Sequence, residues 1–294
     1  MFLLCYVILL LIYLVKGDDS YPWLNQVLRQ EKLYKNCDVL HLKRDYLDTN
    51  TLDHILVDHK HKLLYCYVPK IACTNWKRVL MVLTNQSNAS NLVDIPSNLV
   101  HSKNATVKLS DLDKNLAKKC LETYTTFLMV RHPFERILSA YRNKFNGNYT
   151  NSKYFQKRYG KHILKNYRKD ATKQELKSGA NVTFREFVKF LLNEGQQANE
   201  HWTPIFNLCQ PCAVNYTFVG RYETLPQDSN TLLHMIGAPP IVFPATRIEH
   251  TSVLLRSFMQ ELSIMEIKHL YKLYEYDFRL FGYNLEGVLG FDLA

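Results

Sequence analysis

Glycine is scarce in this chain, which has 10 glycines among 294 residues. No stretch matches the G-x-x-x-x-G-K-[ST] pattern of a Walker A loop, which counts against an ordinary P-loop kinase or NTPase. Internal repeats and low-complexity segments are also absent, so solenoid and array architectures are excluded. The remaining composition, 47% hydrophobic and 22% charged, is that of a globular protein with a sizeable core.

Acidic residues are outnumbered, with 27 Asp and Glu against 37 Lys and Arg and a net charge of +10. Such an excess favours a polyanionic partner, whether nucleic acid, acidic lipid, or a sulfated or carboxylated sugar. Residues 142–177 concentrate it, with eleven Lys or Arg and two acidic residues. This segment is either a solvated helical face or one wall of a polyanion groove.

An uninterrupted apolar run, FLLCYVILLLIYLV, occupies residues 2–15. Fourteen helical residues span about 21 Å, which suits a short membrane anchor or the core of a signal peptide. Both interpretations direct the chain to the secretory pathway. We predict a signal-anchor over residues 1–16, a stem over 17–60 and a luminal domain over 61–294.

Sequons and cysteines support a luminal address. Six cysteines follow Cys5, an even number that permits disulfides in an oxidising compartment. Cys209-Gln-Pro-Cys212 has no second CxxC and no histidine cluster beside it, so a structural disulfide is favoured over zinc, with the pairing left open. The six predicted glycosylation sites are Asn85, Asn88, Asn104, Asn148, Asn181 and Asn215.

The strand–turn–helix pattern occurs twice. Residues 63–69 (LLYCYVP) read as a strand before a helix over 75–84, and residues 125–130 (TTFLMV) precede a helix with Pro133 in its first turn. Residues 216–220 form a third expected strand. The pattern predicts an α/β fold with a central parallel sheet flanked by helices.

Both units carry chemistry suited to an anion. Lys70 and Thr74 lie where a strand turns into a helix, and free backbone N–H groups and the helix dipole favour negative charge there. The alternative is an ordinary strand–helix corner with a surface lysine and no bound anion. In the second unit, Arg131 and Ser139 can hold another phosphate. Two anion sites beside neighbouring parallel strands suit a nucleotide with phosphates at both ends.

The two units resemble the cofactor motifs of Golgi carbohydrate sulfotransferases, most closely the chondroitin and dermatan 4-O-sulfotransferases. The similarity covers roughly residues 63–283. It is carried by the stretches YCYVPKIACTNWKRVL, VRHPFERILSAYRNKF, HWTPIFNLCQPCAVNYTFVGRYETLPQDSN and LYKLYEYDFRLFGY.

The resemblance implies a P-loop-like sulfotransferase fold in a type II Golgi membrane protein with a luminal catalytic domain. The donor would be 3′-phosphoadenosine 5′-phosphosulfate (PAPS), without a metal. The acceptor would be a glycosaminoglycan hydroxyl, the 4-position of N-acetylgalactosamine in chondroitin or dermatan. Other acceptors, among them heparan, an N-glycan or a terminal glucuronic acid, stay open.

The same resemblance assigns the donor site. The first motif would wrap the 5′-phosphosulfate, with Lys70 neutralising the leaving phosphate, and the second would hold the 3′-phosphate. The implied residues are Pro69, Lys70, Ile71, Ala72, Cys73, Thr74 and Asn75, then Arg131, His132, Pro133, Phe134, Glu135, Arg136, Ile137, Leu138 and Ser139.

A histidine suits the base that takes the proton from the acceptor hydroxyl near neutral pH. His101 lies between the two motifs, where related enzymes carry their base, and His201 lies in the family-like NEHW segment. His132 stands where family members often have an acidic residue, which weakens its case. We expect His101 first and His201 second; the alternative for each is a surface or hydrogen-bonded histidine.

Three other functions fit part of the pattern. A lectin-like luminal module without catalysis would use the basic segment but would not need Lys70, Thr74, Arg131 and Ser139 together. A P-loop kinase or NTPase would need the Walker A glycines, which this chain lacks. A nucleic-acid binder would explain the charge, but the apolar leader and the sequons point to another compartment.

Overall fold

The computed structural model of this chain describes residues 22–42, 47, 49–103, 105–147, 150–244 and 251–290. The apolar run at residues 2–15 and the sequons Asn104 and Asn148 lie outside the described residues, so they stay predictions. Within the described ranges, no helix is both long and apolar enough to cross a membrane.

A five-stranded sheet in the order β3-β1-β2-β4-β5 forms the centre of the fold. Strands β2, β4 and β5 are parallel, with Leu64 opposite Thr126 and Leu128 opposite Val219. Strand β1 runs antiparallel to both β2 and β3, so the expected parallel sheet is in fact mixed. The strands are β1 (Ile55–Asp58), β2 (Leu63–Cys66), β3 (Val107–Lys108), β4 (Thr125–Val130) and β5 (Phe218–Arg221).

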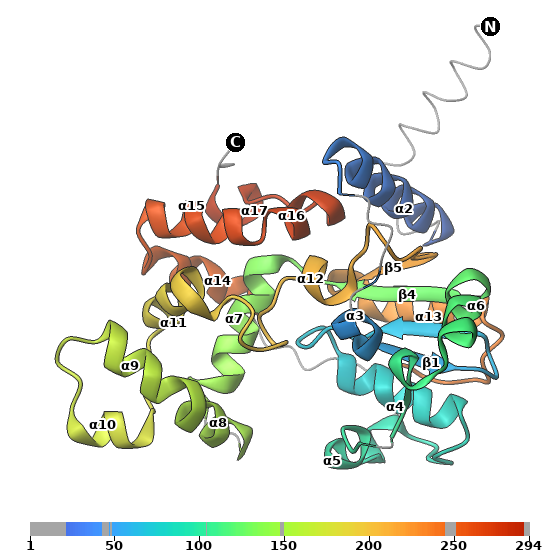
Figure 1. Ribbon diagram of the computed structural model, residues 1–294, viewed down its shortest axis with the longest axis horizontal. Coiled ribbons are helices and arrows are strands. Elements are labelled where there is room, and N and C mark those ends of the chain that lie inside the picture. Colours follow the sequence, from blue (N-terminus) through green and yellow to red (C-terminus); the bar gives the residue numbers. More distant parts are fainter. Residues whose placement is uncertain are drawn as a thin grey trace, which may run out of the picture.

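Helices flank this sheet and continue into a second, helical part of the molecule (Figure 1). Those before β4 are α2 (Pro22–Val39), α3 (Thr49–His54), α4 (Cys73–Leu83), α5 (Ser97–Val100) and α6 (Lys114–Thr123). Those from β4 to β5 are α7 (Pro133–Lys144), α8 (Thr150–Phe155), α9 (Lys161–Tyr167), α10 (Lys173–Ser178), α11 (Phe184–Phe190) and α12 (Ile205–Cys209). Those after β5 are α13 (Leu225–Met235), α14 (Thr251–Gln260), α15 (Ile264–Leu273), α16 (Glu275–Phe281) and α17 (Glu286–Leu289).

Short turns complete the list. Two of them are π-helical, η3 (Gln156–Gly160) and η4 (Leu191–Gly195). The 3₁₀ turns are η1 (Leu92–Asp94), η2 (Leu109–Asp111) and η5 (Tyr222–Thr224).

Two hydrophobic cores divide the molecule. Aromatic rings form the centre of the first, where Tyr65 of β2 stacks on Phe127 of β4 at 4.5 Å between centroids and Trp76 of α4 lies 4.6 Å from Phe127. The second core surrounds the fully buried Trp202 and joins α7, α11, α15 and α16. Helix α7 follows β4 directly and packs in the second core. It therefore connects the end of β4 to that core.

The predicted stem needs correction, because part of it folds with the domain. Helix α2 packs along β5, where Arg29 donates to Val219 O at 3.1 Å and pairs with Asp228 at 2.7 Å. A disulfide joins Cys37 of α2 to Cys212, and β1 lies inside the sheet. The folded domain therefore begins well before residue 61.

Several local predictions hold and others shift. Residues 125–130 form the expected strand and Pro133 is the first residue of α7. The expected strands at 63–69 and 216–220 are β2, which ends at Cys66, and β5, which begins at Phe218; the helix expected over 75–84 is α4, which begins at Cys73. Capping boxes begin α11 and α15, because Thr183 and Ser263 each bond the residue three positions on.

Candidate functional site

The turn between β2 and α4 has a backbone suited to an anion. Lys70 and Ala72 both adopt positive φ, 72° and 54°, and neither is a glycine. Such conformations cost about 1–3 kcal/mol each and persist where the surroundings impose them, commonly at functional sites. Ala72 is also the N-cap of α4 and offers no side-chain cap. The first turn of α4 therefore keeps N–H groups available to a bound anion.

Two arginines from the second motif fix this turn. Arg131 Nη1 donates to Lys70 O at 3.2 Å, and Arg136 Nε donates to Pro69 O at 3.1 Å. In a trans peptide the carbonyl and the following N–H point in opposite directions. The N–H groups of Lys70 and Ile71 therefore point away from the arginines, and the loop presents donors on its other side.

Arg131 is 3% exposed and has three protein partners. Besides Lys70 O, its Nε and Nη2 both approach Glu135 Oε2 at 3.3 Å, and its guanidinium lies 4.0 Å from the Tyr222 ring centroid. These contacts use three of the five N–H groups of a guanidinium. With respect to the described residues, two N–H groups of Arg131 remain for an incoming phosphate. The Glu135 carboxylate would repel that phosphate. Burial raises the pKa of this carboxyl.

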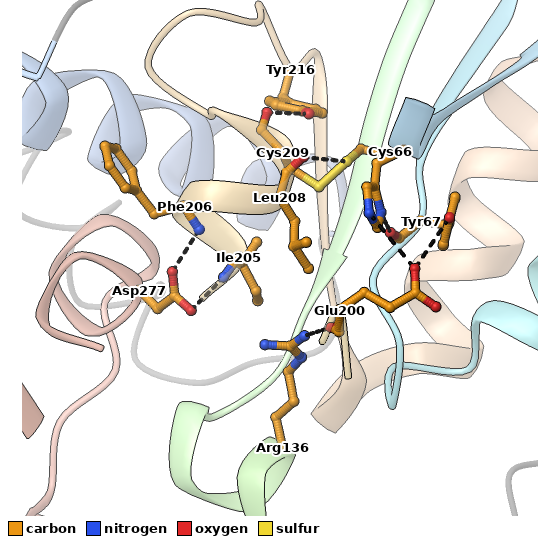
Figure 2. The surroundings of a disulfide bond; sticks show 11 residues. Cys66, Tyr67, Arg136, Glu200, Ile205, Phe206, Leu208, Cys209, Tyr216 and Asp277 are labelled. Carbon is orange, nitrogen blue, oxygen red and sulfur yellow. Dashed lines mark hydrogen bonds and ion pairs between the residues drawn. A yellow bond between two sulfur atoms is a disulfide. The ribbon is translucent and has the colours of Figure 1, made fainter. Parts of the chain in front are cut away.

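Arg136 has a structural role that the sequence did not reveal. It is 1% exposed, and it donates to Thr203 O at 2.7 Å and Glu200 O at 2.8 Å as well as to Pro69 O. Figure 2 shows Arg136 reaching the backbone of Glu200. The side chain thus joins the anion loop to the segment that carries Glu200 and His201.

Other members of the second motif do not reach the site through their side chains. Phe134, Ile137 and Leu138 lie in the second core, at most 1% exposed. Pro133 begins α7 and Ser139 is buried on the same helix at 3% exposure. Their side chains therefore do not line the site, and their predicted place in the donor site, like that of Ser139, stays a prediction.

His132 is also structural. Its Nε2 lies 3.0 Å from Asn284 O, and its ring meets Phe278 edge-on at 5.2 Å between centroids. Burial lowers the pKa of the imidazole. This histidine anchors the segment after α16 to the start of α7, which agrees with its low rank among the candidate bases.

His101 lies at the anion loop. Its Nε2 is 3.0 Å from Thr74 Oγ1 on the first turn of α4. Residue 101 is the C-cap of α5, so the 27 residues that separate the two side chains in sequence form a loop that returns to the turn. Partial burial and the Lys77 ammonium lower the pKa of His101, and a neutral imidazole is the form a base requires.

His201 belongs to the same site. Burial, together with the nearby cations Lys144, Lys70 and Arg136, lowers the pKa of His201 to about 2, and His101 also lies close enough to contribute. Its Nδ1 lies 2.6 Å from Asn199 Oδ1, an acceptor, so Nδ1 carries the proton and Nε2 keeps its lone pair. A pKa that low makes His201 a weaker base than His101 near neutral pH.

Three charged residues complete the site, and the sequence did not reveal that they belong to it. Lys144, at the end of α7, is 5% exposed, and burial beside Lys70 lowers its pKa to about 8. Glu200 accepts from Tyr67 Oη at 3.3 Å and lies 3.7 Å from His54 Nε2. Lys77 Nζ is 4.0 Å from the Tyr67 ring centroid. A buried lysine within a basic segment gives no distinct pattern in sequence.

A disulfide stabilises the segment that follows Glu200 and His201 in the chain. Cys66, the last residue of β2, is bonded to Cys209, the last residue of α12 (Figure 2). Asp277 accepts from the N–H groups of Ile205 and Phe206 at 2.7 and 2.8 Å, which fixes the start of α12. The CxxC cysteines are thus disulfide-bonded as predicted, but each to a distant partner. No group of His, Cys, Asp or Glu suited to a metal occurs in the described part of the chain.

The remaining residues of the first motif support the loop. Ile71 is fully buried, burial raises the pKa of the Cys73 thiol, and Asn75 Oδ1 accepts from Arg78 at 2.9 Å. The site therefore brings Lys70, Thr74, His101 and His201 together around a preformed anion loop. Its cations, its neutral imidazoles and the N–H groups at the uncapped start of α4 can neutralise a phosphate-like group and accept a proton beside it.

Known proteins match most of this chain. A family model described as "Sulfotransferase family" matches residues 53–284. Carbohydrate sulfotransferase 11 of Rattus norvegicus is 39% identical over 275 residues, covering 90% of this chain and 78% of that protein. Carbohydrate sulfotransferase 14 of Homo sapiens is 38% identical over 285 residues, covering 93% and 73%. No solved structure gave a significant match.

The match spans both strand–turn–helix units, the segment that carries His201 and the helices of the second core. Family membership also implies a sulfonate donor. The chain therefore belongs to the sulfotransferase family.

Proposed function

We propose that this protein transfers the sulfuryl group of PAPS to a glycan hydroxyl, the 4-position of N-acetylgalactosamine in chondroitin or dermatan. The observation that carries the proposal is the contact of His101 Nε2 with Thr74 Oγ1 at 3.0 Å, on the loop that bears Lys70. It places a neutral imidazole beside the predicted phosphosulfate cradle. The names of the relatives support a carbohydrate acceptor. The choice of chondroitin or dermatan and of the 4-position rests on the sequence resemblance alone.

The reaction exchanges one sulfur–oxygen bond for another. His101 accepts the proton of the acceptor hydroxyl on Nε2, while that oxygen bonds to sulfur and the bond from sulfur to the bridging phosphate oxygen breaks. Lys70 and the first-turn N–H groups of α4 neutralise the charge that develops on the leaving phosphate. Since Nε2 must present its lone pair, Thr74 is the donor in the resting contact.

The second anion position belongs to Arg131. Its remaining N–H groups and the adjacent helix α7 suit the 3′-phosphate of the donor. Lys144, Lys77 and Glu200 lie on the acceptor side with His201, where a carboxylated sugar meets two cations. His201 keeps an acceptor lone pair there and positions the sugar hydroxyls.

The protein would act in the Golgi lumen as a type II membrane protein. The apolar run at residues 2–15 supports an anchor, and the two disulfides suit an oxidising compartment. Four of the predicted glycosylation sites, Asn85, Asn88, Asn181 and Asn215, are exposed.

The acceptor is tested with sulfur-labelled PAPS and a panel of desulfated chondroitin, dermatan, heparosan and keratan. The products are digested to disaccharides and separated. Label in 4-sulfated galactosamine disaccharides is the expected result. Label elsewhere would keep the enzyme and overturn the acceptor, and label nowhere, with the folded protein still binding polyanions, would favour a lectin-like module.

His101→Ala is expected to lower kcat by about 10²–10⁴-fold, the range for removing a general base. Binding of adenosine 3′,5′-bisphosphate, measured by calorimetry, should stay within threefold of wild type because the imidazole does not hold the donor. His41→Ala is the matched control, since His41 lies outside the site at the end of α2. Normal turnover in His101→Ala would place the base elsewhere.

The pH profile of kcat/KM follows from two shifted pKa values. The pKa of His101 is lowered, so its base form persists to below pH 6.5 and the acid limb should lie there. The pKa of Lys144 is about 8, so its positive charge is lost as pH rises through that value and activity should fall. Lys144→Arg keeps the charge and should move the alkaline limb upward; an unchanged limb would remove Lys144 from the site's chemistry.

A further inference from the structure

Seven lysines occur at every fourth position between residues 153 and 177. We call them the lysine ladder: Lys153, Lys157, Lys161, Lys165, Lys169, Lys173 and Lys177. All seven are exposed. The first four lie on one continuous helix formed by α8, η3 and α9, and the last two lie on α10. Lysines four positions apart share a helix face, so the first four form a row of about 18 Å at helical rise.

The ladder faces away from the catalytic site. On the same helix Phe155, Tyr159 and Ile163 are buried, two positions from the lysines and therefore about 200° around the axis. The buried face lines the site: the Phe155 ring meets His201 at 5.3 Å, and Tyr159 Oη donates to Ala198 O at 2.9 Å. This helix is one wall of the site, and the ladder covers its outer side. The ladder lysines of the basic segment therefore do not line the catalytic groove.

Folding does not explain the ladder. Like charges at i and i+4 destabilise a helix, and none of the seven lysines forms an ion pair with any described residue. The nearby carboxylates of Glu175 and Glu186 are instead bound by Arg168, at 2.6 and 2.7 Å. Elsewhere in the chain, helical lysines do pair at this spacing, as Lys118 does with Glu122.

We propose that the lysine ladder is a second binding surface, for an acidic polysaccharide chain, on the outer side of the wall whose inner side lines the catalytic site. A linear polyanion presents repeated charges that a row of evenly spaced ammonium groups can match. A membrane-surface helix would bury its apolar face in lipid, whereas the apolar face of this helix is buried in protein. The proposal rests on the proposed function only in naming the glycan being modified as the occupant.

The test compares two triple variants of equal charge. Lys157→Gln/Lys161→Gln/Lys165→Gln removes the middle of the ladder, and Lys35→Gln/Lys114→Gln/Lys119→Gln removes three exposed lysines elsewhere. Glutamine is a good helix former, so both variants should fold. The probes are long chondroitin sulfate chains, a chondroitin tetrasaccharide and phosphatidylserine vesicles, with affinities measured directly at low and physiological salt.

The ladder variant is expected to bind the long chains about tenfold more weakly, the sum of three modest surface charge interactions. Its salt dependence should also fall, while the control stays near wild type. KM for the tetrasaccharide should be unchanged and KM for desulfated long chains should rise. Equal weakening in both variants, or no weakening in the ladder variant, would overturn the proposal. Loss of vesicle binding alone would replace the polysaccharide with a membrane.

These readouts separate the two proposals. Direct binding of the long chains does not depend on turnover, so a ladder effect without sulfate transfer would refute the proposed function and keep the ladder. Transfer to the tetrasaccharide with no ladder effect would refute the ladder proposal and keep the proposed function.

Discussion

Lys70→Gly should slow sulfate transfer by about 10²–10³-fold while leaving the fold intact. Residue 70 has φ 72°, a conformation that glycine adopts readily, so the variant removes the ammonium without straining the loop. In the proposed mechanism, the lysine neutralises the charge that develops on the leaving phosphate. Losing one such stabilising group lowers kcat by about 10²–10³-fold at oxyanion-type sites. Turnover of the labelled donor and the midpoint of thermal unfolding are the two measurements.

Two companion variants make this result specific. Lys70→Ala removes the same ammonium but keeps a Cβ at positive φ, so it should be as inactive and somewhat less stable. Lys103→Ala removes an exposed lysine near His101 and should keep full activity. Full activity in Lys70→Gly would contradict the assignment of the anion loop.

Arg136→Ala should cost about 3–5 kcal/mol of the free energy of unfolding, because three buried carbonyls, those of Pro69, Glu200 and Thr203, lose their donor. Transfer should be lost with it, since the same side chain joins the anion loop to the segment of His201. Arg136→Lys keeps the charge but cannot reach three acceptors, so it should fall between wild type and alanine. Denaturant unfolding gives the free energies.

Arg185→Ala is the control for this prediction. Arg185 is bound to Glu266 at the surface, at 3.0 Å and with its side chain 49% exposed, and such pairs contribute up to about 1 kcal/mol. If Arg136→Ala were no less stable than Arg185→Ala and still active, the described link between the two segments would be unimportant.

The sequence predicted the parts of the site whose functional residues lie next to a strand end or a helix start. A strand, a proline and then Lys70 and Thr74 indicated an anion loop, and the loop has the expected uncapped helix start. Arg131 was placed correctly at the end of β4, beside that loop. His101 was ranked first on resemblance, and its side chain does reach Thr74.

Tertiary contacts account for what the sequence could not predict. Arg136 reads as an ordinary helix residue until the carbonyls of residues 69, 200 and 203 converge on it. Lys144 looks like one more lysine of a basic segment, yet it is buried beside Lys70. The mixed sheet depends on β1, a four-residue strand in a segment with no clear alternation.

The stoichiometry of the two products tests whether this protein transfers sulfate from PAPS to a glycan. The full chain is incubated with sulfur-labelled PAPS and desulfated chondroitin, and both the label on the polymer and the adenosine 3′,5′-bisphosphate released are counted over time. We predict one labelled sulfate on the glycan for each bisphosphate released, in wild type but not in Lys70→Gly. Bound donor with no label on any glycan of the panel, from a folded protein, would contradict the account.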